Sequence, residues 1–231
     1  MYIGNRKSFE KMLSDFFESN NLDEDRQIID LCGFHKFNIS YLQGILDINK
    51  ATIILSNIRM NTNDDLGLLE SQLLKTFSKS ILFRTTPIDL EIEIHKKWAQ
   101  RSKVLLTSFN TDGVLWMSTE DLVEICFLPL EVINSRLNTA FDLTGERKYS
   151  MNDLKNIFEE DIGEHIDLPL LNEDIVLNIL LKNGMSSEQA KWLIKYQIES
   201  SDPKIKRNDN VQKILKRKPR KPNFKLNILG G

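Results

Sequence analysis

Hydrophobic positions in the first 90 residues recur in two alternating patterns. Apolar side chains in segment 8–19 return every three or four residues behind a serine that can cap a helix, which predicts a helix there. Short apolar runs between polar residues are instead typical of buried strands. We therefore expect strands at RQIIDLCGF (26–34), KATIILSNIRM (50–60) and KSILFRT (79–85), with helices at ISYLQGILDI (39–48) and LGLLESQLLKTF (66–77).

The following residues continue with short runs that are read in the same way. We expect strands at EIEIH (91–95), KVLLTSF (103–109) and DLVEICF (121–127), then a helix at PLEVINSRLNTAF (129–141) with a proline near its start. Strands that alternate with helices predict an α/β fold with a largely parallel sheet covered by helices. The last three predicted strands lie too close together for helices between them, so part of the sheet should be mixed.

The pattern changes to helices alone after about residue 145. Ser150 should cap a helix at 154–160, Asn172 one at 173–183, and Ser186 or Ser187 one at 188–200. The last two are joined by a short glycine-containing turn and have the proportions of a helix-turn-helix, although any helical hairpin shares them. The expected organisation is therefore a main domain over 1–145, a helical appendage over 146–203 and a flexible basic tail over 204–231.

Overall composition favours an ordered protein of the cytoplasm. The chain has 231 residues, 41% of them hydrophobic, and a formal net charge of −2, which allows a sizeable core. Cys32 and Cys126 both lie in apolar runs and have no zinc-ligand spacing, so we expect buried thiols in a reducing compartment. Because no uninterrupted apolar run of about 18 residues exists, we expect no membrane span.

The segment from 204 to 225 is strongly basic, with Asp209 as its single acid. Its proline-interrupted run KRKPRKP (216–222) predicts an extended or disordered chain. A solvated end is one interpretation, and contact with the phosphates of a nucleic acid is the other. The residues predicted to make such contacts are Lys213, Lys216, Arg217, Lys218, Arg220 and Lys221.

The candidate chemistry lies between residues 95 and 120. His95 and Lys97 are two positions apart at a predicted strand end, so their side chains would share one side of that strand. Ser108 and Asn110 repeat the spacing on the next predicted strand, and Glu120 could hold the second imidazole nitrogen. If the strands pair, these groups converge on a patch suited to a phosphate. A surface histidine among ordinary polar strand ends remains the alternative.

The order of these residues resembles the phospholipase D superfamily. Its signature is His-x-Lys, then Gly-Ser-x-Asn on the following strand, then Glu before a hydrophobic segment and a helix. The resemblance covers about residues 25–145 and implies that His95, Lys97, Ser108, Asn110 and Glu120 are catalytic. Two departures stand out: Thr107 replaces the usual glycine, and Ser102 lies near the position of a usual aspartate.

This resemblance implies a metal-independent phosphodiesterase without a cofactor. One histidine would form a phosphohistidine intermediate and another would protonate the leaving oxygen. Because the chain has one motif, the site would form at the twofold axis of a homodimer, with His95 from each subunit. We expect a nucleic-acid substrate, DNA rather than RNA, and a place in a restriction or antiphage system with partner proteins. A non-catalytic nucleic-acid-binding module and a phospholipid phosphodiesterase are the alternatives.

Overall fold

The central element of the fold is a sheet of parallel strands. The computed structural model describes residues 1–20, 26–33, 39–60, 63–129 and 136–225. Over these residues five strands pair in sequence order, each parallel to its neighbour. They are β1 (Tyr2–Ile3), β2 (Arg26–Asp30), β3 (Ala51–Asn57), β4 (Ser80–Thr85) and β5 (Thr139–Leu143). The strands predicted between residues 26 and 85 are confirmed.

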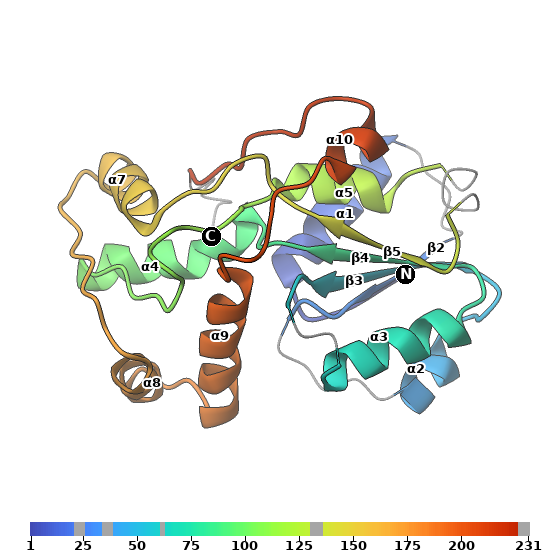
Figure 1. The fold of residues 1–231 in the computed structure, drawn as a ribbon, viewed down its shortest axis with the longest axis horizontal. Helices are drawn as coiled ribbons and strands as arrows, with labels where there is room; N and C mark the ends of the chain where they lie inside the picture. The colour runs from blue at the N-terminus through green and yellow to red at the C-terminus, as the bar shows by residue number, and fades with distance from the viewer. Residues whose placement is uncertain (21–25, 34–38, 61–62, 130–135, 226–231) are drawn as a thin grey trace.

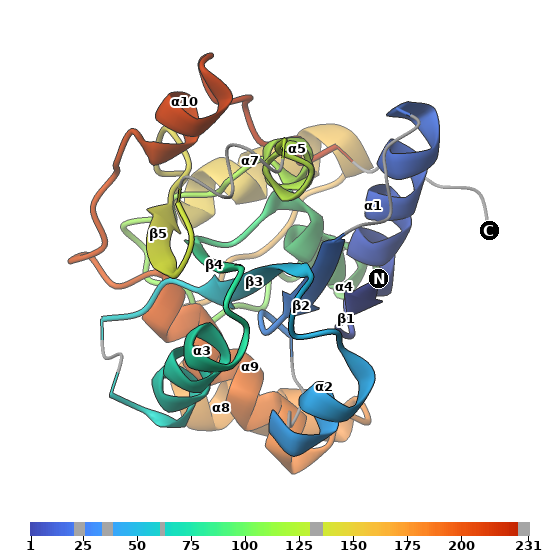
Figure 2. The same ribbon diagram turned by 90° about the vertical axis from the view of Figure 1, so that its right-hand side faces the viewer.

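Helices cover both faces of this sheet (Figures 1 and 2). Successive strand residues point to opposite faces, so Ile28 and Ile53 join one hydrophobic cluster while Ile29 and Ile54 join another. The first face is covered by α1 (Lys7–Asn20), α5 (Thr119–Cys126) and α10 (Asn210–Leu215), and the second by α2 (Ile39–Ile45) and α3 (Asp65–Thr76). Burial on both faces explains why these strands read as continuous apolar runs.

A second group of helices lies beyond the carboxyl ends of the strands (Figure 1). It consists of the short 3₁₀ helix η1 (Asp89–Ile92), α4 (Glu93–Ser102), α7 (Met151–Ile162), α8 (Glu173–Lys182) and α9 (Ser187–Ser200). Three predicted caps are confirmed: Ser150 and Ser186 each form a capping box, and Asn172 accepts from the backbone N–H of Ile175. The cap predicted at Ser8 is wrong, because α1 already begins at Lys7.

The three strands predicted between residues 91 and 127 are wrong. Residues 91–95 belong to η1 and α4, because burial follows a helical spacing through Ile92, His95 and Ala99 rather than the Glu-Ile alternation. Residues 103–109 are irregular, and residues 121–127 lie almost entirely in α5, which is buried on most sides. A short buried helix and a buried strand give the same apolar run, so the expected mixed, phospholipase D-like sheet does not form.

The helix predicted at 129–141 also needs correction. Residues 130–135 lie outside the described part of the chain, and its predicted end is instead strand β5, which pairs with β4.

The basic tail is an ordered part of the fold as far as residue 225. Val211 and Ile214 of α10 join the core of the first sheet face, and Phe224 is 5% exposed. The second helix of the predicted helix-turn-helix, α9, also packs into the fold, because Tyr196 and Gln197 are buried. This burial argues against a helix-turn-helix that reads DNA. None of the described helices is long and apolar enough to cross a membrane.

Candidate functional site

A cavity of about 470 Å³ lies beyond the carboxyl ends of β1 and β2, between α1, α4 and α9. Most of its wall is apolar or aromatic, with Leu90, Ile94, Phe109, Trp116, Trp192 and Leu193. Phe109 packs edge-on against Trp116, with ring centroids 5.4 Å apart. These rings form a wall that suits a flat, apolar molecule better than a strongly charged one.

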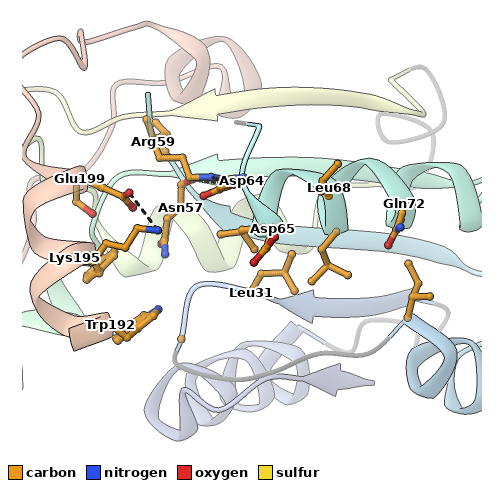
Figure 3. A pocket seen from close by; sticks show the side chains of 17 residues that line it. Leu31, Asn57, Arg59, Asp64, Asp65, Leu68, Gln72, Trp192, Lys195 and Glu199 are labelled. Carbon is orange, nitrogen blue, oxygen red and sulfur yellow. Dashed lines mark hydrogen bonds and ion pairs between the residues drawn. The ribbon is translucent and has the colours of Figure 1, made fainter. Parts of the chain in front are cut away.

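A wider cleft of about 740 Å³ opens beside this cavity, at the carboxyl end of β3 and the start of α3 (Figure 3). The two spaces share Gly33, Trp192 and Tyr196 in their walls, and the two rings are stacked with centroids 5.3 Å apart. The cations Arg59 and Lys195 in the wider cleft are accompanied by acids, since Asp64 and Glu199 lie 3.2 Å and 3.6 Å from them. The cleft therefore has mixed charge and no strong preference for an anion.

A buried polar cluster borders the cavity where the first strand turns into its helix. The Nε of Arg6 lies 2.6 Å from a carboxylate oxygen of Asp30, and Nη1 lies 2.8 Å from Glu91. The hydroxyl of Tyr2 donates to Asp30 at 2.6 Å, and that of Tyr196 donates to Glu91. We call these five residues the Arg6 cluster.

The two acids of the Arg6 cluster respond differently to burial. Burial alone would raise the pKa of Asp30, but the Arg6 guanidinium and the Tyr2 hydroxyl hold it below the ordinary value. Burial raises the pKa of Glu91 despite its contact with the same guanidinium. Asp30 therefore acts as the main counter-ion of Arg6.

His95 lies on α4 and is 8% exposed. Its Nδ1–H donates to the carbonyl of Leu106, and its Nε2 accepts from the side-chain amide of Gln197, both at 3.0 Å. These partners fix a neutral tautomer, and burial lowers the pKa of the imidazole. With both nitrogens engaged, His95 holds α4, residues 103–109 and α9 together, and has no nitrogen ready to attack a phosphate.

Burial of a neutral imidazole predicts a loss of stability in mild acid. Below the ordinary pKa of about 6.5 the unfolded chain binds a proton that the folded chain excludes, so the free energy of unfolding falls as the pH decreases. We expect urea unfolding at about pH 7.5 and about pH 5.5 to show a smaller decrease for His95→Gln than for the unaltered chain. An equal decrease in both proteins would contradict the buried, neutral state.

The other predicted catalytic residues do not converge with His95 as a set. Lys97 lines the same cavity as His95, but residues two apart on a helix lie about 200° apart, and the Lys97 side chain is 60% exposed, with Glu93 3.7 Å from its ammonium. Ser108 and Asn110 come near through their backbone N–H groups, which donate to Gln197 of α9 and to Ser201 at its C-cap. Glu120 is exposed on α5 and lies 3.1 Å from Arg220. The predicted phosphate patch is therefore not formed.

The predicted nucleic-acid contacts divide into two groups. Arg217 and Arg220 are ion-paired to acids of α5, with Asp121 2.8 Å from each. The lysines of the set point to solvent, and Lys213 lies 2.8 Å from Asp209. These are Lys213, Lys216, Lys218 and Lys221.

Of the predicted site residues His95 and Lys97 line the cavity, but sequence reasoning missed the aromatic and buried polar residues that build most of it. Trp116 and Trp192 fit apolar or helical patterns and carried no motif, and the Arg6 cluster joins residues up to 105 positions apart. The sequence contains one indication of this cluster, which is Asp30 at the end of a predicted buried strand. A buried acid at such a position needs a partner.

Comparison with known proteins gives no relative by sequence. A scan against protein-family models finds no match, and a search of the curated proteins also finds none.

Solved structures with a similar fold include NADPH- and NADP(H)-binding reductases and a sugar epimerase. An NADPH-dependent quinone oxidoreductase from Escherichia coli, solved with NADPH, has a TM-score of 0.67 at 13% identity over 92% of this chain and 77% of its own. A nucleoside-diphosphate-sugar epimerase from Staphylococcus aureus gives 0.65 at 10% identity over 96% of both chains. A triphenylmethane reductase from Citrobacter sp., complexed with NADP(H), gives 0.58 at 14% identity over 91% and 77%. At this identity the likeness shows a Rossmann-like α/β fold.

The fold overturns the phospholipase D interpretation. The predicted family and fold, the nuclease and phosphodiesterase activity and the defence role are wrong, because the chain has a parallel Rossmann-like sheet. Nucleic acid as a binding partner stays a prediction. The local reason is that His95 and Lys97 lie on a helix instead of a strand. The homodimer stays a prediction, but it no longer has a shared histidine site to complete.

Proposed function

We propose that this protein binds a flat, largely apolar small molecule in the aromatic cavity between α1, α4 and α9. The observation that carries the proposal is the position and lining of this cavity, which has Phe109, Trp116 and Trp192 in its wall. It lies outside the carboxyl ends of parallel strands, where Rossmann-like folds place their ligands. Polar and charged residues also line the cavity, among them Arg6, Lys7, Glu93 and Lys97, and an apolar wall with polar groups that orient the ligand is typical of small-molecule sites.

The chain's own residues do not fit a dinucleotide in the usual place. Rossmann folds hold a pyrophosphate on a Gly-x-Gly-x-x-Gly turn after the first strand, and no Gly-x-Gly spacing occurs in the 231 residues. Gly4 stands at that turn, but a side chain added there would come within 2.4 Å of the Tyr2 hydroxyl and 2.8 Å of Asp30. The space beside the turn is therefore already filled by the Arg6 cluster.

The acid that would contact a ribose is also engaged. In Rossmann folds an acidic residue about 20 positions after the glycines hydrogen-bonds the ribose, and Asp30 occupies the comparable end of β2. Asp30 is 0% exposed, and its oxygens accept from Arg6, Tyr2 and the backbone N–H of Cys32. Binding a ribose here would require breaking a buried ion pair, which is strongly unfavourable. We therefore favour a binding protein over a dinucleotide-dependent enzyme.

An NAD(P)-dependent reductase or epimerase is the second candidate. The observation in its favour is the likeness to the quinone oxidoreductase that was solved with NADPH, which covers 92% of this chain. A dinucleotide would then have to enter by another route, and the cleft between α3 and α9 is large enough to admit part of one.

Titration with a triphenylmethane dye and a naphthoquinone tests the proposal, with tryptophan fluorescence as the signal. Ile94 lines the cavity and is 42% exposed, so Ile94→Trp should fill the space without disturbing the core. We expect at least about tenfold weaker binding, because a displaced aromatic contact is worth more than 1.4 kcal/mol. The matched control is Ile175→Trp on α8, which is 44% exposed and outside the cavity wall.

Two outcomes would contradict the proposal. The first is the absence of a specific site, seen either as binding of neither probe or as an equal loss of affinity in Ile94→Trp and Ile175→Trp. The second is saturable binding of NADPH together with its oxidation when a probe is added, which would establish the second candidate instead.

A further inference from the structure

Charge is divided unevenly along this chain. Residues 204–225 contain ten of the 31 lysines and arginines but only one of the 33 acids. This segment therefore has a formal charge of +9, while the remainder of the chain has −11. A net charge of −2 conceals this separation, which is a recognised signal of a polyanion-binding segment.

Arginines and lysines of the C-terminal segment (216–225) lie on different sides of it. Nη1 of Arg220 lies 2.8 Å from both Asp121 and Glu124, and the backbone N–H of Arg220 also donates to Asp121. Arg217 makes a parallel pair of contacts with the same two acids. In each arginine one terminal nitrogen is shared between the two carboxylates, so the arginines fasten the segment to α5.

The end of the segment is fastened a second time. The backbone N–H of Asn223 donates to the buried carboxylate of Asp89, and the carbonyl of Phe224 accepts from Lys96 at 3.1 Å. Pro219 and Pro222 stiffen the chain between the two attachments. The segment is therefore held in one path across the surface (Figure 1).

The lysines remain on the outside of this path. We call Lys216, Lys218, Lys221 and Lys225 the lysine row; all four are exposed and have no ion pair among the described residues. At about 3.3 Å per residue their span reaches roughly 30 Å at most, comparable to about nine nucleotide steps of one strand. No large exposed hydrophobic residue lies within the described part of 204–225, so the row lacks the apolar anchor of a membrane-binding segment.

We propose that the lysine row binds the sugar–phosphate backbone of a nucleic acid, independently of base sequence. The arginines, which give forked and more specific contacts, are already paired to α5, and lysines contribute point charges to phosphates. Binding should therefore be electrostatic and depend strongly on salt. Four lysine–phosphate contacts predict a slope of about −3 to −4 in a plot of log K against log salt.

Fluorescence anisotropy with a labelled oligonucleotide of mixed sequence tests this proposal, using duplex DNA, single-stranded DNA and RNA. The test variant replaces the four residues of the lysine row with alanine and leaves Arg217 and Arg220 in place. The matched control replaces four exposed lysines elsewhere, Lys75, Lys79, Lys182 and Lys191, so both variants lose the same charge. Equal melting temperatures would show that both variants remain folded.

We expect the test variant to bind at least about tenfold more weakly at low salt and to lose most of the salt slope. The control should change affinity by less than about threefold. Equal losses in the two variants would overturn the proposal, since net charge alone would then explain binding. Binding to vesicles of phosphatidylserine but to no oligonucleotide would overturn it too.

Discussion

Replacing Asp30 with alanine is expected to lower the free energy of unfolding by about 3–5 kcal/mol, as for other broken buried ion pairs. Among the described residues the substitution leaves Glu91 as the acid paired with the Arg6 guanidinium, whose side chain is only 10% exposed. It also removes the hydrogen-bond acceptor of the Tyr2 hydroxyl and of the backbone N–H of Cys32, which both donate to Asp30. Urea unfolding at neutral pH measures the loss.

Two further variants separate this effect from a general sensitivity to charge removal. Lys97→Ala removes an exposed lysine that lies 3.7 Å from Glu93, and it should change stability by less than about 0.5 kcal/mol. In a double-mutant cycle with Arg6→Ala, the coupling to Asp30 should exceed about 1 kcal/mol. A loss below that value for Asp30→Ala alone would mean that water replaces the cluster easily, and the space beside Gly4 would then be open to a ligand.

Phe224→Ala should also destabilise the protein by about 3–5 kcal/mol, the usual loss for a buried phenylalanine. The ring packs edge-on against Tyr149 and Trp116, with centroids 4.9 Å and 5.8 Å away. Thermal and urea unfolding measure this loss, and Phe224→Leu should lose only about 1–2 kcal/mol because most of the volume remains.

Tyr41→Ala is the control for the Phe224 substitution. Tyr41 is 60% exposed, so its removal should change stability by less than about 0.5 kcal/mol. If Phe224→Ala were equally mild, the C-terminal segment would be only loosely attached, and the fixed path of the lysine row would lose its basis.

Much of the fold could be predicted because local and global signals agree there. The Ile-rich runs that became β2, β3 and β4 are buried on both faces, and the helices begin at serine or asparagine caps such as Ser150 and Asn172. In each case a single pattern spans the whole element, and its boundaries carry their own signals. The two-residue strand β1 has no such pattern and could not be read.

The secondary structure of residues 91–127 was predicted wrongly because the sequence there fits both a strand period and a helix period. The alternation of Ile92 and Ile94 fits a strand, whereas the spacing of Ile92, His95 and Ala99 fits a helix. The second set is the one that is buried in the structure. In a strand, the side chains of His95 and Lys97 would point to the same side of the sheet. The phospholipase D resemblance depended on that arrangement. A helix there puts Lys97 in solvent and His95 against Gln197, from a part of the chain 102 positions away.

The candidate site could not be predicted from the sequence for a related reason. The cavity is lined by residues from the first helix to α9, and the Arg6 cluster depends on pairs that are 24 to 105 positions apart. Such pairs carry no local spacing that a single sequence can reveal. The lysine row is different, since its charge was visible from composition, and only the separation of lysines from arginines needed the fold.

The attachment of the C-terminal segment has a consequence for how the chain folds as it is synthesised. Strands β2, β3 and β4 pair with their neighbours in sequence, so this part of the sheet can assemble early on the ribosome. The hydrophobic cluster around Trp116 is completed only when Phe224 has been made, because Phe224 is one of its buried members. Until then Trp116 and Tyr149 lack the edge-on contacts of this ring, so the cluster is incomplete in a shorter nascent chain.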